Sequence, residues 1–336
     1  MTTFTSADKA KRGATSVSFG RILIPLDGSK IAARVLTGAQ DLAKRLGARI
    51  DLLAVVEPET TELPSYMPFA MSVPHVEDSA SERERAEEVL LERIHAATEY
   101  LNSVGNSLRD DGLKVDVEVK VGDPAQEIVA NAKRGRTDVI AMATRGRSAI
   151  GRGLLGSVTD KVTHSSAVPM LIVRATEGGS TEPISRLIVG LDGSRVAEAA
   201  LDPARELAVS LGVPMLLLRA TAAAARMAAY GGAPYFATAD PYGDTDAKAG
   251  EYLDSVAARQ IELGMNVETI ETKVRPGAAY REIQSAAAEQ SGSLIVLATR
   301  GRSGLTRWVL GSVTDRIIRS SVGPVLVIPP TIGGWT

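Results

Sequence analysis

Several residue types that commonly carry chemistry are absent or scarce in this 336-residue chain. It contains no cysteine, which excludes disulfides, thiolate nucleophiles, iron–sulfur clusters and Cys-type zinc sites. Histidine occurs only at His75, His95 and His164, in positions that form no pattern typical of a metal or catalytic site. The lack of cysteine fits a reducing compartment, so we expect a cytoplasmic protein.

The chain also lacks an excess of charge and a long apolar run. Its 38 basic and 40 acidic residues leave a net charge of −2, too little positive charge to attract nucleic acid or an anionic membrane. Apolar runs such as Ile22–Leu26 are far shorter than the ~18 residues of a membrane-spanning helix. We therefore expect neither nucleic acid nor a membrane as a partner. Residues 1–18 are rich in Ser and Thr and lack the apolar core of a secretory signal, so we expect a disordered tail there.

An internal repeat organises the rest of the sequence. Residues 21–36 (RILIPLDGSKIAARVL) match residues 186–201 at seven of sixteen positions, and residues 141–173 match residues 296–328 at seventeen of thirty-three. A chain of this length favours two domains at about 150 residues each, and a duplication indicates one fold used twice. We expect one domain at 19–175, a linker at 176–184 and a second domain at 185–330.

Short aliphatic runs alternate with longer helical patterns in each half, which is typical of βαβ units with a parallel sheet. We predict an α/β fold with two repeated doubly wound domains, each a five-stranded parallel sheet with helices on both faces. Helices are expected near 30–46, 80–110, 124–134 and 157–166, and strands at 21–26, 49–56, 114–121, 138–142, 169–173, 186–191, 214–219, 267–274, 293–297 and 324–328. Such sheets bind ligands beyond the carboxyl ends of their strands, where the strand order reverses.

A glycine-containing loop follows the fourth strand of each half. Nine residues separate Gly146 from Gly156, and nine separate Gly301 from Gly311. Glycine allows the backbone to approach a ligand closely, and a helix that begins at Ser157 would offer unpaired N–H groups to a phosphate. Phosphate binding is one interpretation of this pattern.

The same loop supports a second interpretation. Ser157-x-x-Asp160 and Ser312-x-x-Asp315 match a capping box, which closes a helix without any ligand. The residues alone leave phosphate binding and capping equally open. The two aspartates could also hold Mg²⁺ beside a phosphate, although capping is the favoured account of them.

An aspartate follows the first strand of each half, in Leu-Asp-Gly-Ser at Asp27 and again at Asp192. A carboxylate at this edge can accept hydrogen bonds from ribose hydroxyls or from an adenine amino group. The alternative is that it caps the next helix.

One apparent motif is misleading. Residues 151–156 spell G-x-G-x-x-G, but they do not directly follow a strand, and the second copy at 306–311 reads TRWVLG. No G-x-x-x-x-G-K-[ST] occurs either. A dinucleotide-binding fingerprint and a P-loop are therefore excluded at the motif level.

In combination these motifs resemble the universal stress protein family in tandem, over about residues 18–175 and 184–330. The resemblance is carried by Leu-Asp-Gly-Ser, Thr-Arg-Gly-Arg-Ser, Gly-(nine residues)-Gly-Ser-Val-Thr and the last strand Pro-Val-Leu-Val-Ile. It implies ATP binding, because ATP-binding members carry Gly-x-x-Gly-(nine residues)-Gly-Ser/Thr. The first glycine of that pattern is Ala143 here and Ala298 in the second copy. The added methyl group is a modest obstacle to binding if φ is negative and a costly one if φ is positive.

The resemblance implies a binding site in each half. In the first half it assigns Asp27, Val55 facing the base, Ala143, Gly146, Arg147, Gly156, Ser157, Val158 and Thr159. In the second half it assigns Asp192, Ala220, Ala298, Gly301, Arg302, Gly311, Ser312, Val313 and Thr314. The implied cofactor is ATP, with Mg²⁺ as its candidate companion.

Neither loop offers a P-loop lysine, a histidine or an evident pair of carboxylates for acid–base chemistry. We therefore expect a stress-response regulatory protein that binds an adenine nucleotide and catalyses at most slow ATP hydrolysis. One alternative is a nucleotide-free scaffold with vestigial pockets, which Ala143 and Ala298 favour. Another is an adenine-nucleotide α-hydrolase, whose Ser-Gly-Gly loop differs from the Asp-Gly-Ser-Lys at residues 27–30.

The last strand of each half, Pro169–Val173 and Pro324–Ile328, is apolar. An unpaired apolar edge strand is a liability, and members of the family often dimerise through this strand. We expect the two halves to pair here as an intramolecular pseudo-dimer.

Overall fold

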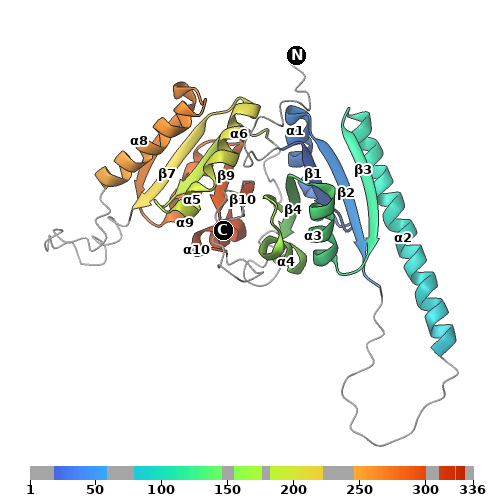
Figure 1. Cartoon of the computed structure of the whole chain (residues 1–336). Coiled ribbons are helices and arrows are strands. Elements are labelled where there is room, and N and C mark those ends of the chain that lie inside the picture. Colours follow the sequence, from blue (N-terminus) through green and yellow to red (C-terminus); the bar gives the residue numbers. More distant parts are fainter. Residues whose placement is uncertain are drawn as a thin grey trace, which may run out of the picture.

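The computed structural model describes residues 19–58, 79–145, 155–175, 182–221, 246–299, 310–321 and 323–329. These residues form a ten-stranded sheet in the order β3-β2-β1-β4-β5-β10-β9-β6-β7-β8 (Figure 1). The strands are β1 Arg21–Pro25, β2 Arg49–Val56, β3 Lys114–Val121, β4 Val139–Arg145, β5 Met170–Ala175, β6 Arg186–Leu191, β7 Met215–Thr221, β8 Ile270–Pro276, β9 Ser293–Ala298 and β10 Val325–Ile328.

Helices connect the strands within each half. The first half contains a 3₁₀ helix at Ala32–Arg34, α1 Val35–Leu46, α2 Ser79–Asp110, α3 Pro124–Gly135 and α4 Ser157–Ser165. The second half contains α5 Arg195–Glu198, α6 Leu201–Leu211, α8 Asp246–Glu262, a 3₁₀ helix at Val267–Thr269, α9 Ala279–Glu289 and α10 Ser312–Ser320.

Each half is a parallel sheet whose strand order reverses beside its first strand. In the first half β1 pairs with β2 through Pro25 and Leu53 and with β4 through Ile22 and Val139. In the second half β6 lies in the same way between β7 and β9. The predicted pair of doubly wound α/β domains is confirmed.

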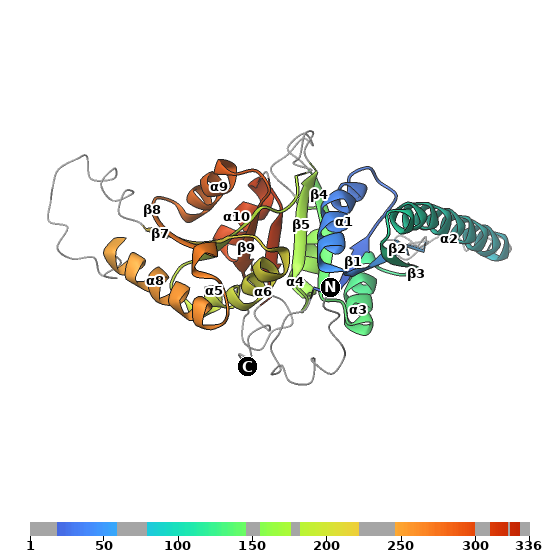
Figure 2. The ribbon, with the colours of Figure 1, turned by 90° about the horizontal axis from the view of Figure 1, so that it is seen from above.

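Alternating side chains of each strand pack against helices on opposite faces of the sheet. On β1, Ile22 and Ile24 belong to the core beneath α1, α2, α6 and α8, whereas Leu23 belongs to the core beneath α3, α4, α9 and α10. Figure 2, seen from above, shows the helices on the two faces of the sheet. This period-two burial is what near-continuous apolar strands require when both faces are covered.

The two halves join edge to edge. Strands β5 and β10 pair antiparallel, with Leu326 opposite Leu171 and Val325 opposite Ile172. These side chains belong to the cores on the two faces, so both cores continue from one half into the other. The predicted pseudo-dimer through the last strands is present, and we call this junction the β5–β10 seam.

Some predicted boundaries were wrong by a few residues. The segment 30–46 starts with a 3₁₀ turn because the Ser29 hydroxyl accepts from the N–H of Ala32 at 3.1 Å. Residues 267–269 form a 3₁₀ turn rather than the start of β8, because the Asn266 side chain accepts from the N–H of Glu268 at 3.1 Å. Such local side-chain bonds compete with the ladder bonds of a strand.

Candidate functional site

The predicted site lies at the carboxyl edge of each parallel sheet. Asp27 follows β1, Val55 lies next to the end of β2 and Ala143 lies near the end of β4, and these three strands are parallel. Helix α4, which begins at Ser157, returns to the same edge, because the Thr159 hydroxyl lies 3.5 Å from the carbonyl oxygen of Ala143. The second half repeats this contact between Thr314 and Ala298, also at 3.5 Å.

Part of the predicted site lies outside the described residues. Gly146, Arg147, Gly301 and Arg302 belong to this part. The site described below is therefore built from the turn after the first strand, the ends of the second and fourth strands, and the start of α4 or α10.

The turn after the first strand has the same geometry in both halves. An Asp27 carboxylate oxygen accepts from the N–H of Ser29 at 2.9 Å, and Asp192 does the same for Ser194. The following helical turn is capped by the serine instead, since the Ser194 hydroxyl accepts from Ala197 at 3.2 Å. The helix-cap alternative for the two aspartates is therefore wrong: each closes a short local turn, and Asp27 is exposed at this edge.

Helices α4 and α10 begin without a side-chain cap. The N-cap residues are Gly156 and Gly311, and neither helix start has a side-chain cap among the described residues. Ser157 and Ser312 are already the first helical residues, so neither can cap its own helix. The capping-box interpretation of Ser157–Asp160 and Ser312–Asp315 is wrong, and the first N–H groups of both helices remain available to a ligand.

Neither the backbone conformation nor the packing of the described residues requires glycine at position 156 or 311. Their φ angles are −51° and −60°, which any residue adopts. A Cβ added to Gly311 would meet nothing within 4 Å, and one added to Gly156 would meet only Thr159, at 4.0 Å. No described residue therefore fills the space that a side chain at either N-cap would occupy.

The two helices approach each other across the seam (Figure 1). Arg319 on α10 donates to Asp315 at 2.8 Å and lies 3.7 Å from an oxygen of Asp160 on α4. Asp160 also lies 3.7 Å from His164. These aspartates therefore face cations rather than a capped N–H group. In the part of the chain that the structure describes, no three His, Asp or Glu side chains cluster as a metal site would require.

Replacing the family's first glycine by alanine introduces no backbone strain. Ala143 and Ala298 are strand residues that pack against the core, and Arg136 is the only non-glycine residue with positive φ among those described. The methyl groups are thus accommodated within β4 and β9. This departure does not distort the site.

The two halves have different side chains beneath the turn after the first strand. The sequence motifs did not predict this difference. By strand register Arg219 on β7 stands beside Leu191 and immediately precedes Ala220, the second-half counterpart of Val55. Its guanidinium lies over the ring of Tyr252, 5.0 Å from the centroid. Ala54 occupies the matching place in the first half. A position-by-position comparison of β2 with β7 would have found this change.

The tyrosines facing these positions are also a matched pair. Glu-Tyr-Leu occurs at residues 99–101 on α2 and again at 251–253 on α8. Burial, and then the negative charge of Asp27, raise the pKa of Tyr100. Tyr252 instead donates to Glu198 at 3.0 Å, and burial together with this bond raises its pKa. Arg259 pairs with the same carboxylate at 3.1 Å.

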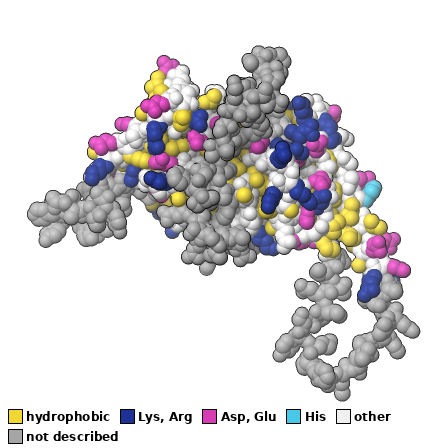
Figure 3. All heavy atoms as spheres, viewed as in Figure 1, with side chains coloured by type: hydrophobic (Ala, Val, Ile, Leu, Met, Phe, Trp, Pro, Cys, Tyr) yellow, Lys and Arg dark blue, Asp and Glu magenta, His cyan; other side chains and the backbone are white. Residues whose placement is uncertain are grey.

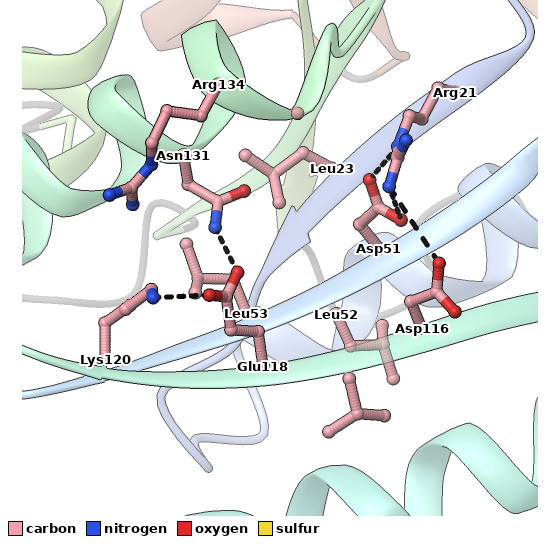
Figure 4. A pocket seen from close by; sticks show the side chains of 12 residues that line it. Arg21, Leu23, Asp51, Leu52, Leu53, Asp116, Glu118, Lys120, Asn131 and Arg134 are labelled. Carbon is pink, nitrogen blue, oxygen red and sulfur yellow. Dashed lines mark hydrogen bonds and ion pairs between the residues drawn. The ribbon is translucent and has the colours of Figure 1, made fainter.

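A separate pocket of about 400 Å³ lies over the amino-terminal and middle parts of β1, β2 and β3 (Figure 4). Arg21 is bonded there to Asp51, and Asn131 and Lys120 are bonded to Glu118. The Lys120 ammonium holds the pKa of Glu118 below its usual range. This pocket contains none of the predicted site residues, and its acids and bases neutralise one another.

The described surface in view in Figure 3 carries charges of both signs. On the face in Figure 3, Lys and Arg are interspersed with Asp and Glu over the described residues. No helix in the described ranges combines the length and apolar character needed to cross a bilayer.

Comparison with known proteins agrees with the duplicated fold. The sequence profile of the universal stress protein family matches residues 18–174 and again residues 183–329. A universal stress protein of Mycolicibacterium smegmatis is 25% identical over 314 residues, covering 92% of this chain and 97% of its own length. Another from Methanocaldococcus jannaschii is 30% identical over 156 residues, covering 46% of this chain and 82% of its own length.

A solved structure shares the whole architecture. The crystal structure of a universal stress protein from Archaeoglobus fulgidus superposes with a TM-score of 0.62, at 24% identity. The match covers 93% of this chain and 99% of that protein. The tandem arrangement is therefore found in another solved protein.

Proposed function

We propose that this chain, which belongs to the universal stress protein family in tandem form, binds ATP at the carboxyl edge of its sheet. In this proposal it acts as a regulatory protein in a stress response. The phosphates would lie at the start of α4, and the base and ribose would lie between the turn at Asp27 and the end of β2 at Val55. The chain would act by binding rather than by catalysis.

The observation that carries this proposal is the open, uncapped start of α4 at Gly156. A buried or closely packed helix end normally finds a side-chain partner for its first N–H groups. Among the described residues no side chain supplies one, and a Cβ on Gly156 would meet only Thr159, at 4.0 Å. Phosphate oxygens are suited to this place, because they accept from backbone N–H groups and are attracted by the positive end of the helix dipole.

Asp27 would supply the second contact. Its side chain is exposed and is positioned by its bond from the N–H of Ser29. A carboxylate so placed accepts hydrogen bonds from ribose hydroxyls or an adenine amino group. Mg²⁺, if bound, would be held chiefly by the phosphates, because Asp160 already faces Arg319 and His164.

The test is calorimetric titration of ATP into wild type and the Gly156→Val variant of the full chain. The valine should reduce affinity at the first-half site at least tenfold without unfolding the protein, because the glycine has an ordinary φ and open surroundings. Gly47→Val is unsuitable as a control because its φ is +64°. Leu91→Ala, on the 60% exposed side chain of α2, is a suitable control and should bind as wild type does. If wild type binds no ATP, the nucleotide-free scaffold is the better description.

A further inference from the structure

The turn after the first strand encloses different space in the two halves. Gly28 and Gly193 occupy the same position, with φ of +79° and +84°. A Cβ built on Gly28 meets nothing within 4 Å, whereas one built on Gly193 lies 2.9 Å from Nη1 of Arg219. No described residue of the first half therefore fills the space beside the turn, whereas a guanidinium fills it in the second half.

Arg219 is held in this place from the opposite side as well. Its guanidinium lies over the Tyr252 ring at 5.0 Å, a distance at which a cation is attracted to the aromatic face. Tyr252 is fixed in turn by its bond to Glu198, which also pairs with Arg259. The turn, the end of β7, α5 and α8 thus form one connected polar cluster.

The first half has no equivalent cluster. Ala54 stands where Arg219 stands, and Ala33 stands where Glu198 stands, because residues 21–36 align with 186–201. Tyr100 remains, and it lies close enough to Asp27 for the carboxylate to raise its pKa. The first half thus keeps the exposed Asp27 carboxylate beside the turn, and it has no guanidinium at the place of Arg219.

We propose that the two halves have different roles: the first half binds the nucleotide, and Arg219 closes the corresponding pocket of the second. This inference rests on the proposed function, since it concerns the base and ribose end of the same site. A ligand entering the second pocket would have to displace the guanidinium from between Gly193 and Tyr252. The phosphate end does not distinguish the halves, because α4 and α10 begin alike.

The test measures the number of ATP molecules bound per chain by calorimetry. Wild type should bind one, Gly156→Val none, and Gly311→Val one. Arg219→Ala should bind two, because it restores in the second half the side chain that the first half has at Ala54. Adding Gly311→Val to Arg219→Ala should return the value to one.

Arg259→Ala is the matched control. It removes the same charge from the same cluster but leaves Arg219 against Gly193, so it should still bind one ATP. Circular dichroism establishes that each variant is folded. Arg219→Gln, which also removes the guanidinium, serves in its place if the alanine variant does not fold.

The possible outcomes separate the inference from the function on which it rests. Two ATP molecules per wild-type chain, or an unchanged value of one in the folded Arg219 variant, would overturn the inference and leave ATP binding established. A single wild-type site that Gly311→Val abolishes would also overturn it. If neither wild type nor the Arg219 variant binds ATP, the proposed function itself is wrong and the inference fails with it.

Discussion

The first and second halves share a fold but differ at two places in the described residues, the pocket over β1, β2 and β3 and the turn after the first strand. Arg21, which lines the pocket over β1, β2 and β3, is bonded to Asp51. Its counterpart Arg186 is buried and donates to the carbonyl oxygen of Ala286 at 2.7 Å. Asp51 itself corresponds to Leu216, which lies in the core. In these two places the second half is the more closed of the two. A duplicated domain can therefore keep its sheet while side chains fill the spaces that are open in the other copy.

We expect the two halves to unfold together because their cores are continuous across the β5–β10 seam. Leu171→Ala removes a side chain that is only 2% exposed and stands opposite Leu326, so it should lower the free energy of unfolding by about 2–5 kcal/mol. Urea denaturation should show one transition that shifts as a whole, since the cores cross the seam. Leu91→Ala should change stability by no more than about 0.5 kcal/mol. Two transitions, of which only one moves, would show that the halves fold independently.

A smaller effect is expected from a contact that only the first half makes. Arg45 on α1 donates to the carbonyl oxygens of Ile184 at 2.6 Å and Leu211 at 2.8 Å, and its second-half counterpart is Ser210. Arg45→Ala should cost about 1–3 kcal/mol in urea denaturation, because it removes two hydrogen bonds from a charged donor. The neighbouring Lys44→Ala, which breaks only an exposed pair, should cost less than about 0.5 kcal/mol. Equal effects would show that Arg45 does not bridge the halves.

The smallest difference concerns the start of α3 and of α9. Asp123 caps α3 by accepting from the N–H of Gln126 at 2.9 Å, whereas Ala278 begins α9 without a cap. Asp123→Ala should cost about 0.5–1 kcal/mol, the lower part of the range for caps because the side chain is partly exposed. Ala278→Asp should gain a similar amount.

The cap should also depend on pH. The bond from Gln126, and then the charge of Lys161, lower the pKa of Asp123 below its ordinary 3.8. Its stabilisation is therefore complete above about pH 4 and is lost as the pH falls through the lowered pKa. The difference in urea midpoint between wild type and Asp123→Ala should shrink below about pH 4. A difference that stays constant in acid would mean that the carboxylate is not the cap.

The repeat and the short aliphatic runs between helical patterns predicted the fold well, because strands buried on both faces of a sheet are apolar nearly throughout. The boundary errors arose where one polar side chain, such as Ser29 or Asn266, diverts the backbone into a 3₁₀ turn. The capping-box error had a related cause: the motif fits Ser157, but the helix begins at Ser157 itself, one residue earlier than a Ser157 cap would require.

Arg219 was harder to predict for a different reason. Its surroundings combine Gly193 and Glu198, which precede it in the sequence, with Tyr252, which follows it, and these residues converge only in the folded chain. The motifs consist of residues that are identical in the two halves, whereas Arg219 stands at a position where the halves differ. Aligning Glu-Tyr-Leu on α2 with its copy on α8 would have supplied the missing register.

The seam also has a consequence for the order in which the protein is synthesised. Strand β5 ends at Ala175 and its partner β10 begins at Val325, so about 150 residues must follow before the pair can form, which takes about 8–30 s at 5–20 residues per second. During this interval a folded first half would expose an apolar edge strand to other nascent chains. Slow translation of the second half should therefore favour pairing between different copies, and the yield of monomer should rise with translation speed.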